Sequence, residues 1–297
     1  MSYESFHKYH PIVNFLYFAS VLLFAMALKH PLSMLISFVS ALLYAIQCDG
    51  KKALLFTLKL CLPMFLLTAL INPLFNHEGV TILYYFKSGL PLTLESIVYG
   101  LCSGGMLVTI LVWFISFNKV FTSEKTTYLF GKIIPAMSLV LNMTLRFIPR
   151  FKHQLNTIIE AQRSLNSEAT NKSLISKIKF EIKILSIMLT WSFESAIETA
   201  DSMKSRGYGL KGRTTFSPYR LESRDKAILT MLLLLIALLV FGMCLSVFSF
   251  DYFPVISKIS LSPVNLCFYF VYFALCILPV LLNILEDRKW KSIHSNL

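Results

Sequence analysis

Ionisable side chains are scarce in the long apolar stretches of this 297-residue chain. Within the stretches long enough to cross a bilayer, the charged residues are Lys59 and Glu95, and both lie near an end of their stretch. Proton pumps and ion-coupled transporters need ionisable groups near the middle of the membrane, because a charge is retained there only where it has a function. The scarcity argues against a self-sufficient secondary transporter and against a channel with a charged filter.

Sequence signatures of ATP hydrolysis and of metal binding are also missing. No G-x-x-x-x-G-K-[ST] loop occurs, so the chain does not hydrolyse ATP by that route. The six histidines are dispersed, and no two of them share a helix face with a carboxylate at metal-ligand spacing. The cysteines have no paired spacing, which predicts neither a disulfide framework nor a zinc site. They are Cys48, Cys61, Cys102, Cys244, Cys267 and Cys276.

Apolar residues, in contrast, are abundant. The chain is 56% hydrophobic and 15% charged, too apolar for a soluble domain. Its apolar runs are continuous rather than alternating, so they predict membrane-spanning helices and not barrel strands. The sequence therefore predicts an all-α polytopic bundle of about six spans, at residues 11–28, 32–47, 53–75, 94–117, 227–250 and 263–285.

Glycine and proline residues add detail to these spans. Gly104 and Gly105, with Gly100 nearby, predict either close helix packing or a flexible point in the fourth span. The prolines within helical stretches predict kinks or helix ends. They are Pro63, Pro135, Pro149 and Pro279.

Positive charge is concentrated in one block between the spans. Residues 118–226 hold 18 of the 28 Lys and Arg residues and 9 of the 16 acidic ones, which gives this block +9 of the net charge of +12. Basic loops stay in the cytoplasm, so the block and both termini should lie there. We expect three parts: N-terminal membrane helices at 1–117, a cytoplasmic region at 118–226, and C-terminal membrane helices with a basic tail at 227–297.

The first span admits a second interpretation. Residues 1–28 also resemble a signal peptide, with Lys8, an apolar run and small residues at Ala25 and Ala27. Against cleavage, no soluble exported domain follows.

The cytoplasmic block has a helical pattern from residue 133 to residue 207, with expected breaks at Pro149 and around 166–172. A second long helix is predicted over 174–205, and its apolar stripe changes from large to small side chains near Ser192. Small residues let another helix approach, which suits two long crossing helices. The first helix has its apolar face at Phe151, Leu155, Ile158, Ile159, Gln162 and Leu165, and the second at Ile178, Ile182, Leu185, Leu189, Ser192, Ala196, Ala200 and Met203.

The second helix should end at Gly207 in the left-handed conformation. Arg206 beside it is either a capping charge that complements the helix dipole or a guanidinium that docks into a partner and pairs with a carboxylate. For the dispersed lysines of the block, contact with anionic lipid is the favoured interpretation. RNA binding is disfavoured, since no aromatic residues interleave with the basic ones as a stacking platform.

Five short motifs stand out along the chain. They are Asn72-Pro73-Leu74-Phe75-Asn76, Leu145-Arg146-Phe147-Ile148-Pro149-Arg150, Ala161-Gln162-Arg163-Ser164-Leu165-Asn166, Ala200-Asp201-Ser202-Met203-Lys204-Ser205-Arg206-Gly207-Tyr208-Gly209 and Gly212-Arg213-Thr214. Together they resemble those of a known family, the EcfT/CbiQ-like transmembrane T components of energy-coupling-factor (ECF) transporters, which are modular importers of vitamins and transition metals. The motif at 200–209 is the most specific, and the likeness covers most of the chain.

The resemblance implies a non-catalytic scaffold without a cofactor. In the family, two long coupling helices cross in an X, and each ends in a small-Arg-small triplet whose arginine docks into one of two ABC-type ATPases. Ser205, Arg206 and Gly207 match the second triplet. The membrane part holds a substrate-binding S component, so the implied function is uptake of a vitamin or other micronutrient across a bacterial cell membrane. The implied partners are these ATPases, the S component and membrane lipid, with no nucleic acid.

The first triplet departs from the family pattern. The pattern places its arginine at position 165, where this chain has Leu165, preceded by Ser164. Either Arg163 substitutes from a neighbouring face, or the contact is apolar and Leu165 fills the groove. Two residues along a helix turn a side chain by about 200°, which favours the apolar contact. The asymmetry suggests two non-identical ATPase subunits.

Two other functions remain open at this point. A conventional ABC permease would form its own path, and the lack of polar residues in the spans weighs against it. A membrane scaffold unrelated to transport is compatible with the basic block alone.

Overall fold

A computed structural model describes residues 6–85, 91–133, 135–165, 174–210, 219–257 and 262–295 of the chain. The polypeptide divides into two compact units. Unit 1 consists of Met1–Lys125 and Tyr219–Leu297, and unit 2 of Thr126–Pro218. The chain thus leaves unit 1 after Lys125 and returns to it at Tyr219.

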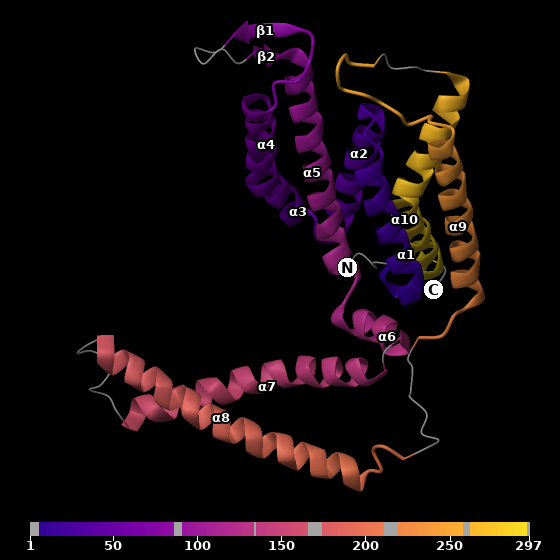
Figure 1. Ribbon diagram of the computed structural model, residues 1–297. Helices are drawn as coiled ribbons and strands as arrows, with labels where there is room; N and C mark the ends of the chain where they lie inside the picture. The colour runs from indigo at the N-terminus through magenta and orange to yellow at the C-terminus, as the bar shows by residue number, and fades with distance from the viewer. Residues whose placement is uncertain are drawn as a thin grey trace. The chain divides into compact units, whose positions relative to one another are not determined.

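Unit 1 is a bundle of apolar helices (Figure 1). Within the described residues, five helical stretches are long and apolar enough to cross a membrane, and α1 is apolar but shorter. The predicted all-α membrane bundle is confirmed. Its elements are η1 (Phe6–Lys8), α1 (Pro11–Ala27), α2 (Pro31–Asp49), α3 (Lys51–Phe56), η2 (Thr57–Cys61), α4 (Leu62–Phe75), β1 (Ile82–Tyr85), β2 (Pro91–Thr93), α5 (Leu94–Val120), α9 (Ser223–Cys244) and α10 (Pro263–Ser295).

The helix α5 packs against both α4 and α2. Toward α4 it presents Gly100 and Gly104, where an added Cβ would lie 3.0 Å from the carbonyl oxygen of Ala69 and 3.1 Å from that of Phe65. Of the two predicted roles for the glycines, close packing therefore holds, and α5 continues unbroken through them. Close to Gly100, the Asn72 amide donates to Ser103 at 3.3 Å, which joins the Asn72-Pro73 motif to α5.

The largest side chains in the fully buried core of unit 1 are aromatic. Trp113 of α5 lies 6.1 Å from Tyr17 and 6.4 Å from Phe18 of α1, centroid to centroid. Its indole nitrogen donates to Ser37 of α2 at 3.0 Å. The single polar atom of this large side chain is thereby satisfied away from water.

The carboxylate of Glu95, although buried, has a structural role. It accepts hydrogen bonds from the backbone nitrogen and the hydroxyl of Thr81, the latter at 2.8 Å. These bonds hold the short antiparallel hairpin of β1 and β2 against the start of α5. The sequence analysis did not anticipate this hairpin.

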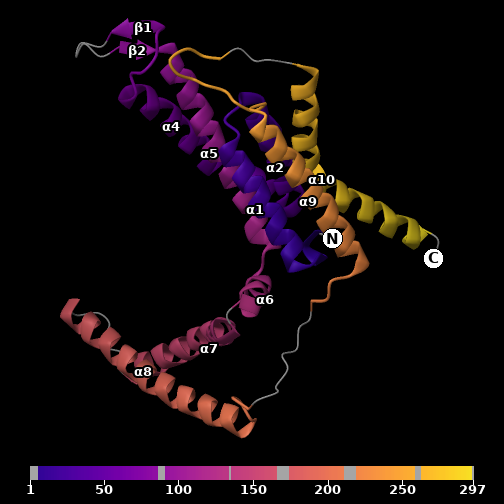
Figure 2. The same ribbon diagram turned by 45° about the vertical axis from the view of Figure 1, so that its right-hand side comes forward.

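The prolines behave differently from one another. Pro63 follows a π-helical segment, η2, at the start of α4, and Figure 2 shows that α10, which contains Pro279, bends along its length. Pro63 thus agrees with a predicted helix end, and Pro279 with a predicted kink. The predicted break at Pro149 is wrong, because α7 (Pro135–Leu165) continues through it. A proline removes one intrahelical hydrogen bond, so a helix of 31 residues keeps its other hydrogen bonds and continues. The second expected break, around 166–172, lies outside the described residues.

Unit 2 contains α7 and α8 (Leu174–Ser205), preceded by α6 (Ser123–Ile133), which begins in unit 1. The helix predicted over 174–205 has these bounds. The two long helices cross, and α7 ends near the start of α8 whereas α8 ends on the opposite side of the unit (Figures 1 and 2). At the contact, the Phe151 ring lies 5.4 Å from that of Trp191, and the Arg150 guanidinium is 5.4 Å from the same ring.

The face that α8 presents at this contact is not the predicted one. Trp191 lies there, and the buried residues of α8 are Ile184 and Ser195, whereas Ala196 and Ala200 are exposed. The predicted stripe of small residues, with Ala196 and Ala200, therefore does not lie at the crossing. A helix with apolar residues on more than one side does not reveal from its sequence which side its neighbour covers.

Candidate docking site at the helix ends

The C-terminal end of α8 is a rigid turn built by glycine. Gly207 has a φ of +75°, as predicted. Its N–H donates to the carbonyl of Lys204 at 2.9 Å, and the N–H of Tyr208 donates to the carbonyl of Met203 at 3.0 Å. This pair of bonds is the Schellman motif, which satisfies the last carbonyls of a helix and fixes the direction of the chain beyond it.

Arg206 occupies the C-cap position of this motif. Its side chain is exposed and makes no ion pair within the part of the chain that the structure describes. Ser205 beside it is exposed too, and its hydroxyl donates to the carbonyl of Ser202 at 2.9 Å. The guanidinium is therefore presented on an ordered backbone, with its donors available to a partner.

The end of α7 is also accessible. Arg163, Ser164 and Leu165 are all exposed, and Leu165 retains 76% of its surface. The Ser164 hydroxyl donates to the carbonyl of Glu160 at 3.0 Å, so it is turned back along its own helix. Asn166, and the later motif at residues 212–214, lie outside the described residues. The two predicted triplets thus lie at the ends of two crossing helices, and the structure does not bring them together.

A line of large apolar side chains along α8 is exposed. Ile184, one of the two buried residues of α8, is two positions from Ile182 and so lies on a different face. Exposed fractions in the line range from 49% for Leu189 to 68% for Phe193. An exposed apolar surface of this size on a helix marks a site of contact with another protein or with a membrane. The line consists of Ile178, Ile182, Leu185, Leu189, Phe193 and Ile197.

Both places where the chain passes between the units are held by the same N-terminal segment, residues 6–14. On the outgoing side, Lys125 is 1% exposed, and its ammonium donates to the carbonyls of His7 and Val120. A buried charge is retained when it is hydrogen-bonded. Burial, and then the positive charge of Lys125, lower the pKa of His7.

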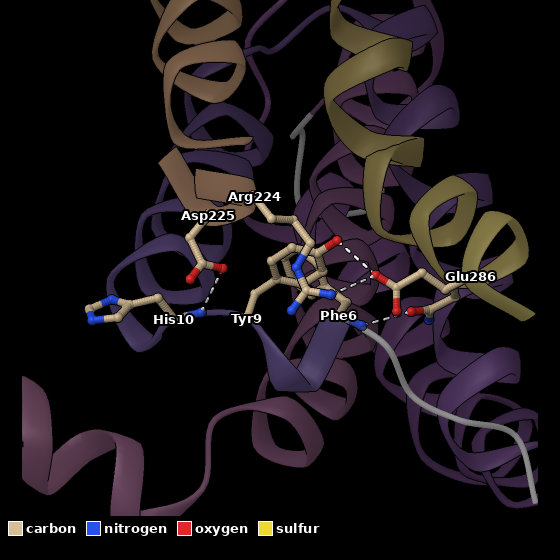
Figure 3. Close-up of polar contacts among 7 residues, drawn as sticks. Phe6, Tyr9, His10, Arg224, Asp225 and Glu286 are labelled. Carbon is tan, nitrogen blue, oxygen red and sulfur yellow. Dashed lines mark hydrogen bonds and ion pairs between the residues drawn. The ribbon is translucent and has the colours of Figure 1, made fainter. Parts of the chain in front are cut away.

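On the returning side, Asp225 caps the start of α9 and also binds the N-terminal segment (Figure 3). Its carboxylate accepts from the backbone nitrogens of Glu222 and of His10, at 3.2 and 3.4 Å. The ring of Tyr219, where the chain re-enters unit 1, lies 6.4 Å from that of His10. The first turn of α9 is therefore tied to the first turn of α1.

A third contact adds α10 to this junction. Figure 3 shows the hydroxyl of Tyr9 and the guanidinium of Arg224 directed at the same carboxylate oxygen of Glu286, at 2.9 and 3.4 Å. The guanidinium also lies 4.5 Å from the centre of the Tyr9 ring. Burial, followed by the hydrogen bond to Glu286, raises the pKa of Tyr9 to about 12. The hydroxyl thus remains a donor at neutral pH.

The sequence analysis missed this junction. Its residues come from the N-terminal segment and from three distant regions, around positions 125, 225 and 286, and no local pattern links them. Two local signals in the sequence could have indicated part of it. Glu222 and Asp225 have the spacing of a capping box, and His10 directly precedes a proline at a helix start. The His10 ring nitrogen accepts from the N–H of Ile12 at 3.3 Å, and His30 caps α2 in the same way through Leu32.

Comparison with known proteins decides the family. Residues 4–216 match the family model CbiQ, described as cobalt transport protein. The chain belongs to the CbiQ family.

Relatives within this family carry the name energy-coupling factor transporter transmembrane protein EcfT. The protein of Listeria innocua is 30% identical over 207 residues, which cover 64% of this chain and 76% of the relative. The matches to the proteins of Lactococcus lactis (33% identical, 35% of this chain) and Staphylococcus aureus (34% identical, 33% of this chain) span 40% and 37% of those relatives. This CbiQ-family chain is therefore similar to membrane proteins of energy-coupling factor transporters.

Proposed function

We propose that this CbiQ-family chain couples two cytosolic ABC-type ATPases to a substrate-binding S component, for uptake of a vitamin or other micronutrient. Residues 118–226 form the coupling region, and this region and both termini lie in the cytoplasm. The basic charge of the region, +9, supports this orientation. The motion driven by ATP passes through α7 and α8 to the membrane helices.

The observation that carries the proposal is the end of α8. A Schellman turn fixes Gly207, and Arg206 is exposed without an ion pair among the described residues. Arginine suits this task, because its planar fork pairs with a carboxylate through two parallel hydrogen bonds. In this proposal Ser205, Arg206 and Gly207 bind one ATPase, and Arg163, Ser164 and Leu165 bind the other.

The exposed apolar line of α8 supports assembly with further subunits, because a free helix with this face would expose large aliphatic side chains to water. Glu95, a buried carboxylate at the start of α5, is hydrogen-bonded by Thr81, which agrees with a subunit that does not itself bind the transported substrate.

Copurification tests the proposal. Wild-type protein, purified in mild detergent, should bring down ABC-type ATPase subunits, and Arg206→Glu should lose at least one of them. A charge reversal at a docking arginine costs on the order of 2–5 kcal/mol of binding free energy. Lys204→Glu is the matched control, since it makes the same charge change two residues away on an exposed side chain.

Two results would contradict the proposal. One is the absence of any ATPase with either form, provided that chemical crosslinking preserves known membrane complexes in the same preparation. The other is equal loss with Lys204→Glu and Arg206→Glu, which would indicate a general charge effect.

A further inference from the structure

A groove lies at the edge of the apolar bundle of unit 1, where the ends of three membrane-spanning stretches meet. It is a cavity of about 530 Å³ between the end of α2, the start of α3 and the last turns of α5. Small-ligand sites commonly have volumes of about 300–1,000 Å³. The lining residues are Asp49, Lys52, Ala53, Phe56, Leu111, Phe114, Ile115, Asn118 and Lys119.

The groove combines an apolar wall with a charged rim. The wall is formed by aromatic and aliphatic side chains, of which Phe56 and Phe114 are 41% and 42% exposed. The rim contains Asp49 and Lys52 at the α2–α3 turn and Lys119 at the end of α5. Because these residues follow or precede membrane spans, the rim lies at the boundary between the hydrocarbon and the head groups, whichever side of the membrane it faces.

The charges on the rim are held in different ways. The ammonium of Lys119 donates to Asp49 at 2.9 Å, and these side chains retain 45% and 29% of their surface. Lys52 is exposed and has no hydrogen bond or ion pair within the described residues. Asp49 thus holds the ammonium of Lys119 in place, and Lys52 gives the rim a net positive charge.

This composition selects one class of ligand. A metal ion is disfavoured, since no group of three His, Cys, Asp or Glu side chains comes together in the described part of the chain. A small soluble anion would leave the apolar wall uncovered. An anionic glycerophospholipid fits both parts, because its acyl chains cover the wall and its phosphate meets the lysines.

We propose that this groove binds an anionic glycerophospholipid of the phosphatidylglycerol type. Lys52 and Lys119 bind the phosphate, and Asp49 positions Lys119. An acyl chain lies along Phe56, Leu111 and Phe114, and the Asn118 amide is available to a head-group hydroxyl. The proposal does not depend on the coupling function.

Native mass spectrometry of the full-length protein tests the proposal. The protein is released from bilayers with equal amounts of phosphatidylglycerol and phosphatidylethanolamine, and the lipid that it retains is counted. Wild type should retain phosphatidylglycerol in excess. Lys52→Gln should lower the retained phosphatidylglycerol about fivefold, the change expected when roughly 1 kcal/mol of lysine-to-lipid attraction is lost. Lys52→Arg should restore it.

Lys51→Gln is the matched control, because Lys51 is the neighbouring exposed lysine and does not line the groove. It should retain as much phosphatidylglycerol as wild type. Equal retention of both lipids by wild type, or equal losses in Lys51→Gln and Lys52→Gln, would overturn the proposal. A thermal unfolding curve of Lys52→Gln that matches wild type assigns the loss to binding and not to folding.

Discussion

At the scale of single residues, His30 has a structural role that no sequence pattern predicted. It is 3% exposed, lies 5.1 Å from the Phe250 ring and 5.2 Å from the Tyr269 ring, and caps α2 through its δ nitrogen. Only a neutral imidazole can accept this hydrogen bond through the δ nitrogen. Burial lowers the pKa of His30, so the folded protein resists its protonation.

This arrangement predicts acid sensitivity. Since the folded-state pKa lies below the ordinary value of about 6.5, the contribution of His30 is complete above that pH and is lost as the pH falls through the folded pKa. His30→Asn keeps a capping group that does not titrate. Thermal unfolding in detergent at pH 7.5 and pH 5.5 should therefore show a smaller acid-induced drop in Tm for His30→Asn than for wild type. Equal drops would show that His30 does not contribute.

At the scale of helices, the α4–α5 contact depends on glycine at particular positions. A Cβ on Gly104 would lie 3.1 Å from the Phe65 carbonyl oxygen, which is backbone, whereas one on Gly105 would meet the flexible end of Met34 at 2.7 Å. Backbone cannot move aside as a methionine can.

We therefore expect Gly104→Ala to be less stable than Gly105→Ala by about 1 kcal/mol or more, measured as unfolding midpoints in the same detergent. The substitution is the same in both, so intrinsic helix propensity cancels. If Gly105→Ala is the less stable variant, the described packing of α4 on α5 is wrong.

The helices also show how far the sequence could predict this molecule. The bounds of α8 and the left-handed Gly207 follow from local rules, and both were predicted. The covered face of α8 was not predicted, because it is set by a tertiary contact between Trp191 and Phe151 of α7. Tyr9 and Glu286 are equally invisible to pattern analysis, since 277 positions separate them in the sequence. The positions of the two triplets of the candidate site, at the exposed ends of two helices, could be predicted from the sequence. The junction formed by residues 6–14 with Lys125, Asp225 and Glu286 could not.

At the scale of the whole molecule, residues 6–14 hold both connections between the units. In the function proposed above, motion transmitted along α6 or α9 would act on this segment, because Lys125 and Asp225 both bind its backbone. In the proposed transporter, the segment is a point where motion of the coupling region reaches α1 and α10.

Tyr9→Phe tests this role, since it removes the hydroxyl bound to Glu286 and keeps the ring. A hydrogen bond to a charged group contributes about 1.5–3 kcal/mol. We expect ATPase subunits to copurify as with wild type, while substrate uptake per ATP hydrolysed falls severalfold. Tyr85→Phe, at an exposed tyrosine of the β1 strand, is the control and should change neither. A parallel loss of docking and uptake in Tyr9→Phe would contradict the assignment.

The central claim is that the two helix ends each bind one ATPase, and the mass of the intact complex measures it most directly. The wild-type complex should contain two ATPase subunits per chain, Arg206→Glu one, Leu165→Asp one, and the double variant none. Arg163→Gln should retain two if the first contact is the apolar one at Leu165, which is 76% exposed. Two ATPase subunits bound to the double variant, with its helices intact by circular dichroism, would contradict the account.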